Sequence, residues 1–218
     1  YGKKSLSQVW APLLNDSNYT ESMEDNNPYE LPFKGTIRPT FPYALAELAK
    51  TNNQYDLMTA TPFGNTMTME FAKAAILGEE LGKDNIPDML CLSFSATDYV
   101  GHQFGPQSKE LQDTYIRLDR DLDSLLQFLD ARVGVGNYVL FLSADHGAAN
   151  NPSWMMDHKL AAGYFVSDKL EELVESKLIK KYGEGNCLGQ PGFPLASATG
   201  ANGPRNKNVA IEIFKWRK

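Results

Sequence analysis

The sequence has few of the features that define several large classes of protein. Its 218 residues include only two cysteines, Cys91 and Cys187, which are too few for a disulfide framework. It contains no run of 18 apolar residues, and it does not begin with a charged segment followed by an apolar one. We therefore expect neither a membrane span nor a signal peptide, and no membrane partner. The length is sufficient for a substantial buried core.

Positive charge is also scarce. The chain has 21 Lys and Arg residues against 27 Asp and Glu residues, which gives a net charge of −6. Binding to a nucleic-acid backbone requires clustered Lys and Arg, so we expect no nucleic-acid partner. A protein of this charge would have to attract any anionic substrate locally.

Three common catalytic signatures are missing. Neither the glycine-rich dinucleotide pattern nor the P-loop pattern occurs. Ser95 and Ser143 do not lie in a Gly-x-Ser-x-Gly turn, which argues against a serine-triad hydrolase. Asn65 or Thr66 can cap the helix that is expected to begin here, so we interpret Thr66 as a helix cap rather than a nucleophile.

The apolar pattern divides the chain into three segments. Residues 1–60 are rich in Asn, Pro, Ser and Tyr and predict a loop-rich covering segment. Residues 61–165 predict an α/β core, and residues 166–218 predict a helix followed by an edge strand at 209–214. Within the first segment we expect a helix over 42–50 and short edge strands over 29–33 and 36–41.

The core segment predicts a strand, a helix and a second strand. Residues 89–94 and 138–142 are apolar runs typical of strands that are buried on both faces. Between them, residues 108–132 show helical spacing of leucines, with acidic residues expected mostly on the solvated face. Such a crossover makes the two strands parallel, with their carboxyl ends at one edge. The predicted fold class is α/β, with a mostly parallel sheet flanked by helices.

Two Asp–His pairs directly follow these strands. Asp98 and His102 are four residues apart, which places both on one face of a helical turn. Asp145 and His146 are adjacent, and a turn at Gly147 can aim both inward. In α/β sheets, ligands bind beyond the carboxyl ends of strands, and these oxygen and nitrogen donors suit zinc. The four side chains therefore predict a metal site, and two ions are expected.

Each pair also has a simpler interpretation. Asp98 and His102 could form an ordinary surface or capping pair, and Asp145 could satisfy the backbone of its own turn. Metal binding is favoured because both pairs fall at the same sheet edge. The chain has only three histidines, and we interpret the third, His158, as lying outside the ligand set because Lys159 beside it would repel a cation.

The two motifs resemble those of a known superfamily. Residues 95–106, SATDYVGHQFGP, followed by residues 142–147, LSADHG, resemble the alkaline phosphatase superfamily. The resemblance is closest to bacterial alkaline phosphatases related to type I phosphodiesterases and nucleotide pyrophosphatases, and it is strong over residues 61–165. It implies an alkaline phosphatase-like fold and a periplasmic or secreted enzyme that hydrolyses small-molecule phosphate monoesters.

The resemblance also implies roles for the four side chains. Asp98 and His102 would bind one zinc ion, and Asp145 and His146 would bind a second. The nucleophile, a further Asp and a further His of the family cannot be assigned here, so no catalytic residue is predicted in this chain. We therefore expect the middle portion of a longer enzyme, an incomplete domain that is inactive alone.

Two alternatives to monoester hydrolysis stay open. Within enzymes, a phosphodiesterase or nucleotide pyrophosphatase would share these ligands. Outside enzymes, the chain could be a non-catalytic fragment or a degenerate metal-binding module that lacks the nucleophile. The sequence does not indicate an oligomeric state.

Overall fold

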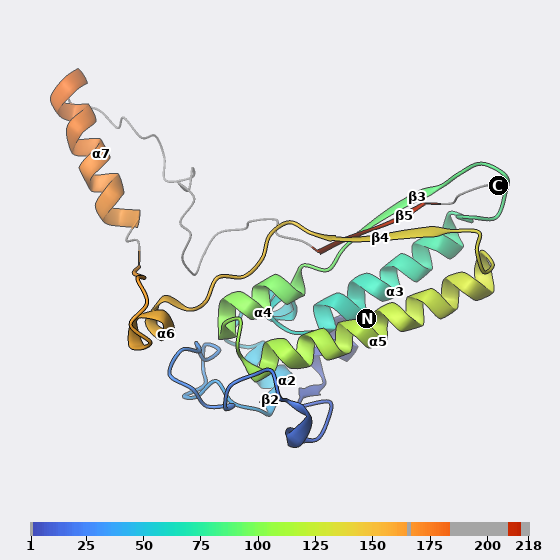
Figure 1. The fold of residues 1–218 in the computed structure, drawn as a ribbon, viewed down its shortest axis with the longest axis horizontal. Coiled ribbons are helices and arrows are strands. Elements are labelled where there is room, and N and C mark those ends of the chain that lie inside the picture. The colour runs from blue at the N-terminus through green and yellow to red at the C-terminus, as the bar shows by residue number, and fades with distance from the viewer. Residues whose placement is uncertain (1, 165–166, 184–208, 215–218) are drawn as a thin grey trace. The chain divides into compact units, whose positions relative to one another are not determined.

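The computed structural model describes residues 2–164, 167–183 and 209–214 (Figure 1). The chain divides into two compact units, Tyr1–Asn151 with Asn206–Lys218 and Pro152–Arg205. The division into segments 1–60, 61–165 and 166–218 stays a prediction. In chain order the elements are α1 (Gly2–Leu6), β1 (Val9–Trp10), η1 (Asp16–Asn18), β2 (Tyr43–Ala44), α2 (Leu45–Leu48), η2 (Gln54–Ala60), α3 (Phe63–Gly78), β3 (Met89–Ser93), α4 (Ala96–Phe104), α5 (Lys109–Arg132), β4 (Val139–Ala144), α6 (Pro152–Asp157), α7 (Ser167–Tyr182) and β5 (Val209–Phe214), where η denotes a 3₁₀ helix.

A three-stranded sheet with the order β3-β5-β4 organises the first unit. β5 pairs antiparallel with both neighbours, so β3 and β4 run parallel to each other, as the crossover predicts. The α/β class is therefore confirmed, although both ladders among the described strands of this sheet are antiparallel rather than parallel. The edge position predicted for residues 209–214 is wrong, because Ile213 pairs with Leu90 on one side and Leu140 on the other. A central strand has backbone partners on both edges, and the composition of residues 209–214 does not show how many partners the strand has.

Helices α3 and α5 pack against each other and beneath the sheet (Figure 1). Leu118, Leu122, Leu125 and Leu129 of α5 face this core, as their spacing predicts, whereas Leu126 is 37% exposed. Ser108 caps α5, since its Oγ accepts a hydrogen bond from the Leu111 N–H at 3.2 Å. The buried side chains of this core are Met69, Ala72, Ile76, Leu92, Phe94, Leu118, Leu125 and Leu129.

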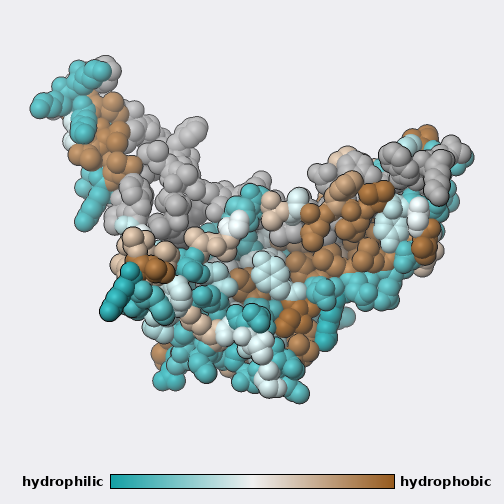
Figure 2. Space-filling view, in the orientation of Figure 1, coloured by the Kyte–Doolittle hydropathy of each residue, from teal (hydrophilic) through white to brown (hydrophobic). Residues whose placement is uncertain are grey.

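The predicted burial of β3 and β4 on both faces is wrong in the part of the chain that the structure describes. Met89, Phe141 and Leu142 are 53%, 54% and 61% exposed, and Cys91 is exposed as well. Successive strand residues point to opposite faces, and α3 and α5 cover the face that carries Leu90 and Leu92. Figure 2 shows hydrophobic surface along the part of the molecule where Figure 1 draws β3 and β4.

The N-terminal segment is held by aromatic packing more than by strands. The edge strands predicted at 29–33 and 36–41 are absent from this described stretch, where Pro32 and Pro39 remove ladder donors. The helix predicted at 42–50 is shortened to α2, because Tyr43 pairs with Trp10 in a two-residue ladder. The rings that form the cluster lie 5.2–5.9 Å apart and belong to Trp10, Phe33, Phe41, Tyr43 and Phe104.

Two acidic residues of α5 contradict the expectation of a solvated face. Glu110 and Asp113 are both 0% exposed. Asp113 accepts hydrogen bonds from Trp10 Nε1 at 2.8 Å and from the Tyr19 hydroxyl at 2.6 Å, and it pairs with Arg117 Nε at 2.6 Å. The periodicity of α5 does not predict the burial of these two residues, because their hydrogen-bond donors Trp10, Tyr19 and Tyr43 belong to the distant N-terminal segment.

A pair of buried glutamates lies beside this network. Glu110 accepts a hydrogen bond from the Tyr43 hydroxyl at 2.5 Å, and Glu30 accepts one from the Asn27 side chain. The second carboxyl oxygen of each glutamate is buried and has no hydrogen-bond partner. Burial, followed by the charge of Glu110, raises the pKa of Glu30 to about 9, and burial raises the pKa of Glu110 to about 8. Both carboxyls are therefore protonated at neutral pH.

The second unit contributes α6 and α7. Among the described helices of either unit, none is long and apolar enough to cross a bilayer. His158 directly follows α6, where its ring stacks on Trp154 with centroids 4.0 Å apart. Its Nδ1 also lies 2.8 Å from the Trp154 carbonyl oxygen. His158 is thus held by its own helix, and its exclusion from the ligand set stays a prediction.

Candidate metal centre

Helix α4 presents the first Asp–His pair. Val100 and Phe104, at 0% and 1% exposure, anchor one face of α4 in the core. Asp98 and His102 lie one turn apart on another face, with His102 Nε2 3.3 Å from Asp98 Oδ2. The four-residue spacing therefore brings the two side chains together, as predicted.

The turn after β4 presents the second pair. The backbone N–H of His146 donates to Asp145 Oδ1 at 3.1 Å, and His146 Nδ1 lies 2.8 Å from the Gly147 carbonyl oxygen. A carbonyl can only accept, so Nδ1 carries the proton in this contact and Nε2 of the neutral ring keeps its lone pair. Histidines that bind metals are commonly held in this way, with the second ring nitrogen donating to a carbonyl.

The two pairs meet at the carboxyl ends of β3 and β4. His146 Nε2 lies 3.8 Å from Asp98 Oδ1 and 3.7 Å from Asp145 Oδ2. Asp98 thus contacts the histidine of each pair, one through each carboxyl oxygen. The structure brings all four predicted side chains to one place within the first unit.

The donor set is compatible with zinc, although the group does not form a complete cage. Tetrahedral zinc bonded at about 2.0–2.1 Å separates two of its donor atoms by about 3.3 Å. Asp98 Oδ2 and His102 Nε2 show this separation, whereas the contacts to His146 are wider. Across residues 2–164, 167–183 and 209–214, no three His, Cys, Asp or Glu side chains are arranged to hold one ion. The chain supplies pairs of ligands, and an ion would need more.

The four side chains are open to solvent. The exposed fractions are 22% for Asp98, 45% for His102, 39% for Asp145 and 42% for His146. An incoming ion or substrate could therefore reach them without unfolding the core.

The hydroxyl residues considered from the sequence have other roles or places. Thr66 does not cap α3, whose N-cap position is Pro62. Its hydroxyl instead donates to Asp121 Oδ2 at 2.8 Å, which ties α3 to α5. Ser95 is the N-cap residue of α4, and Ser143 lies within β4. The structure therefore supports the interpretation of Thr66 as a structural residue, through a different contact from the one predicted.

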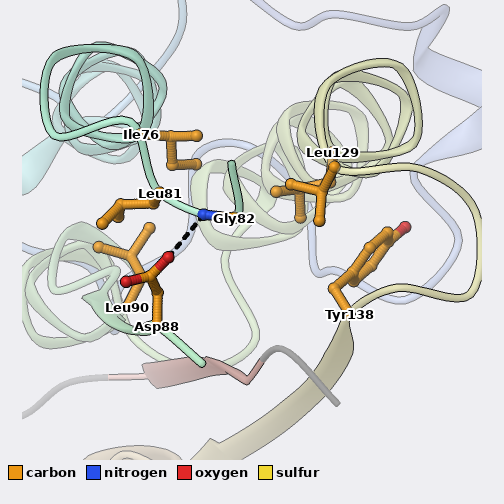
Figure 3. A pocket seen from close by; sticks show the side chains of 8 residues that line it. Ile76, Leu81, Gly82, Asp88, Leu90, Leu129 and Tyr138 are labelled. Atoms are coloured by element: carbon orange, nitrogen blue, oxygen red, sulfur yellow. Dashed lines mark hydrogen bonds between the residues drawn. The ribbon is translucent and has the colours of Figure 1, made fainter. Parts of the chain in front are cut away.

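Two cavities lie outside this centre. The first, of about 30 Å³, is lined by Ile76, Leu81, Leu90 and Leu129, with Asp88 accepting from the Gly82 N–H at 2.6 Å (Figure 3). It lies at the amino ends of β3 and β4, the opposite edge from the Asp–His pairs. Its size admits about one water molecule, and its apolar lining offers little to hold one.

The second cavity is an open groove of about 590 Å³. It runs beside α3 from Tyr55 and Met58 to Phe71, and it reaches Ser95 and Ala96 at the start of α4. Its lining is mostly apolar, which is unsuited to binding a phosphate group. Neither cavity offers an alternative to the Asp–His group for anion chemistry.

Comparison with known proteins decides the family. The model of the type I phosphodiesterase / nucleotide pyrophosphatase family matches residues 3–205. The chain belongs to this family. The name of the family includes phosphodiesterases. The match confirms the resemblance drawn from residues 95–106 and 142–147.

Individual relatives of this family member are similar over most of the chain. It is 48% identical over 178 residues to a calcium-transporting ATPase of Myroides odoratus, covering 81% of the chain and 32% of the relative. It is also 48% identical over 184 residues to the alkaline phosphatase PafA of Elizabethkingia meningoseptica, covering 84% of the chain and 33% of the relative. The chain thus spans about a third of the length of these curated relatives.

A solved structure supports the fold. The crystal structure of wild-type alkaline phosphatase PafA matches with a TM-score of 0.71 and 39% sequence identity. The match covers 85% of this chain and 35% of that structure. The arrangement of helices and strands described above is therefore part of an alkaline phosphatase fold.

Sequence reasoning considered Asn65 only as a possible cap of its own helix and missed its contacts beside the centre. Asn65 is 1% exposed, and its side chain bonds to both Ala96 and Thr97 at the start of α4. A Gly-Asn pair at the start of a predicted helix was the available signal. The pair does not reveal its partner, because that partner lies 31 residues further along the chain.

Proposed function

We propose that this chain is part of a metal-dependent phosphate-ester hydrolase, in which Asp98 and His102 hold one zinc ion and Asp145 and His146 hold a second. The observation that carries the proposal is the convergence of the two pairs, with His146 Nε2 within 3.8 Å of both aspartates. Membership in the phosphodiesterase family supports the reaction class. The zinc sites rest on the donor chemistry of these four residues.

The chain's own residues would bind and orient the ions. Asp98 and Asp145 supply oxygen ligands. The Gly147 carbonyl favours the His146 tautomer with the proton on Nδ1, so that the lone pair of Nε2 can bind a metal ion. When bound, paired metal ions supply the positive charge that stabilises the attacking and leaving oxygens of a phosphoryl transfer. This charge would also let a protein of net charge −6 act on an anionic substrate.

For the substrate we favour small-molecule phosphate monoesters. The name alkaline phosphatase PafA, borne by a curated relative and by the matched crystal structure, supports monoesters, whereas the family name supports diesters and nucleotide pyrophosphates as the alternative. By the same likeness we place the parent enzyme in the periplasm or outside the cell. The described part of the chain offers no apolar helix that could span a membrane, and we propose no nucleic-acid partner.

Zinc titration tests the ligand set. By isothermal titration calorimetry, Asp98→Ala or His146→Ala should weaken zinc binding at least about tenfold, because each removes one of few donors. His158→Ala is the matched control, since it removes a histidine held by its own helix. The assignment is wrong if the first two variants bind zinc as the wild type does, or if His158→Ala weakens binding to the same extent.

An activity assay separates the enzyme from the non-catalytic alternative. The nucleophile is not among the residues that we assign, so we expect the 218-residue chain to bind zinc without hydrolysing p-nitrophenyl phosphate. A longer protein that includes the flanking regions of the parent should hydrolyse it, and Asp145→Ala in that protein should abolish turnover. Turnover by the 218-residue chain alone would contradict the expected inactivity. Absence of turnover in the longer protein would favour a degenerate metal-binding module.

A further inference from the structure

The amino terminus of α4 is not capped by its own preceding residue. Ser95, at the N-cap position, has helical dihedral angles of φ −66° and ψ −25° and makes no side-chain capping hydrogen bond. The first backbone N–H groups of a helix have no partner within the helix. Since Ala96 and Thr97 are each 3% exposed, water cannot readily satisfy them.

Asn65, in the first turn of α3, satisfies the Ala96 N–H and also binds the Thr97 side chain. Its Oδ1 accepts a hydrogen bond from the Ala96 N–H at 3.2 Å, and its Nδ2 donates to Thr97 Oγ1 at 3.0 Å. Both hydrogen bonds are buried, so replacing the amide would leave polar groups without partners. One side chain thus holds the first two residues of another helix.

The neighbouring glycine makes this contact possible. A Cβ atom built on Gly64 would lie 2.6 Å from the Met58 carbonyl oxygen and 3.1 Å from the Ala96 Cβ. The first distance is shorter than a real Cβ contact, and the obstacle is backbone rather than a flexible side chain. Gly64 therefore allows α3 to approach α4 closely enough for the Asn65 amide to reach it.

The held turn is the one that carries the proposed ligands. Asp98 directly follows Thr97, and its two carboxyl oxygens contact His102 and His146. A rotation of the first turn of α4 would move Asp98 away from His146, which is fixed independently by β4 and the Gly147 carbonyl. We propose that Asn65 is a positioning residue for the metal centre, which caps α4 from α3 and thereby keeps Asp98 directed at His146. The inference rests on the proposed function, because the purpose of the positioning is metal binding.

Two measurements on the 218-residue chain test the inference. In Asn65→Ala, the amide hydrogen of Ala96 should exchange at least about tenfold faster, because its acceptor is lost. Zinc affinity by isothermal titration should fall about tenfold, as expected when a residue that orients a ligand is removed. Asn65→Asp keeps an oxygen acceptor for the Ala96 N–H and should restore zinc affinity to within about threefold of the wild type.

Thr66→Ala is the matched control. It removes the neighbouring side chain, which also bonds between helices, but to Asp121 of α5 rather than to α4. It should leave the zinc affinity unchanged even if it lowers the melting temperature. Equal losses of affinity in Asn65→Ala and Thr66→Ala, or unchanged affinity in Asn65→Ala, would overturn the positioning role.

The remaining outcomes are also decisive. If Asn65→Ala does not fold, Thr97→Val removes only one of the two hydrogen bonds, and it should weaken zinc binding about threefold; unchanged affinity would then refute the role. If the wild-type chain takes up no zinc, the proposed function fails for this chain. In that case Ala96 exchange alone tests the cap, and unchanged exchange in Asn65→Ala would refute it separately.

Discussion

Aspartates occur in two environments in this chain: buried at the start of α5, and partly exposed in the Asp–His group. The two environments give the same side chain different roles. Asp113 is fully buried and accepts four hydrogen bonds, from Trp10, Tyr19, Arg117 and the Leu13 N–H. Asp98 and Asp145 are 22% and 39% exposed, and each lies 3.3–3.8 Å from a histidine nitrogen of the group. The first carboxylate is enclosed by donors, whereas the other two are partly open to solvent, where an ion can reach them.

This difference has an energetic consequence. A buried carboxylate is tolerated only when donors compensate for the loss of water, so the donors around Asp113 are required for folding. An exposed carboxylate remains hydrated and contributes little to stability. We therefore expect the α5 network to control the free energy of unfolding and the Asp–His group to control metal binding, and the predictions below test this division.

The largest expected effect is the loss of stability at alkaline pH. The pKa values of Glu30 and Glu110 are raised in the folded chain to about 9 and about 8, so folding favours their protonated forms. Their contribution is complete below the unfolded pKa of about 4.3 and is lost as the pH rises through 8 to 9. Between pH 6 and pH 9 the free energy of unfolding should fall on the order of 5 kcal/mol, measured by urea unfolding.

Glutamine variants identify the groups responsible. Glu30→Gln and Glu110→Gln keep one acceptor oxygen and place an amide at the orphaned oxygen, but they cannot ionise. Combined, they should flatten the pH dependence over this range. Glu24→Gln is the control, because Glu24 lies exposed in the same loop as Glu30. An alkaline slope in the double variant equal to that of the wild type would show that other groups cause it.

The next effect is the loss of the central acceptor. Asp113→Asn should lower the free energy of unfolding by about 3–5 kcal/mol, because it removes the charge that pairs with Arg117. The asparagine side chain also replaces one acceptor oxygen with an NH₂ group, which cannot accept the hydrogen bonds that the Asp113 carboxylate receives. Urea unfolding at pH 7 measures the change.

Asp123→Asn is the control on the same helix. Its carboxylate is exposed and accepts from Gln127 on the helix surface, so the substitution should change stability little. Comparable losses at positions 113 and 123 would mean that helix charge, rather than the buried network, determines stability.

The sequence predicts much of the scaffold and of the candidate site. The leucine spacing of α5 and the apolar runs of β3 and β4 are local signals, and the structure places these elements within a few residues of their predicted bounds. The convergence of Asp98 and His146 follows from the crossover, since both follow parallel strands. The helix and the two strands could be predicted because the residue pattern within each segment determines its local structure.

The failures concern partners that are distant in the sequence. The sequence predicts Asp113 on the solvated face of α5, and its burial could not be predicted because its donors Trp10 and Tyr19 lie 103 and 94 residues away. Likewise, the pattern of residues 209–214 indicates a strand, but it does not indicate that this strand pairs with both β3 and β4. The composition of the N-terminal segment also does not predict the aromatic cluster of Trp10, Phe33, Phe41, Tyr43 and Phe104, because its rings come from positions far apart in the sequence.

The smallest expected change in stability is at the candidate site. It allows a direct comparison of one substitution at a buried and at a partly exposed aspartate. Asp145→Asn makes the same chemical change as Asp113→Asn, but on a side chain that is 39% exposed. It should alter the free energy of unfolding by less than about 0.5 kcal/mol, yet weaken zinc binding at least about tenfold. Urea unfolding and zinc titration on the same sample measure both. A stability loss close to that of Asp113→Asn would show that Asp145 is part of the folding framework.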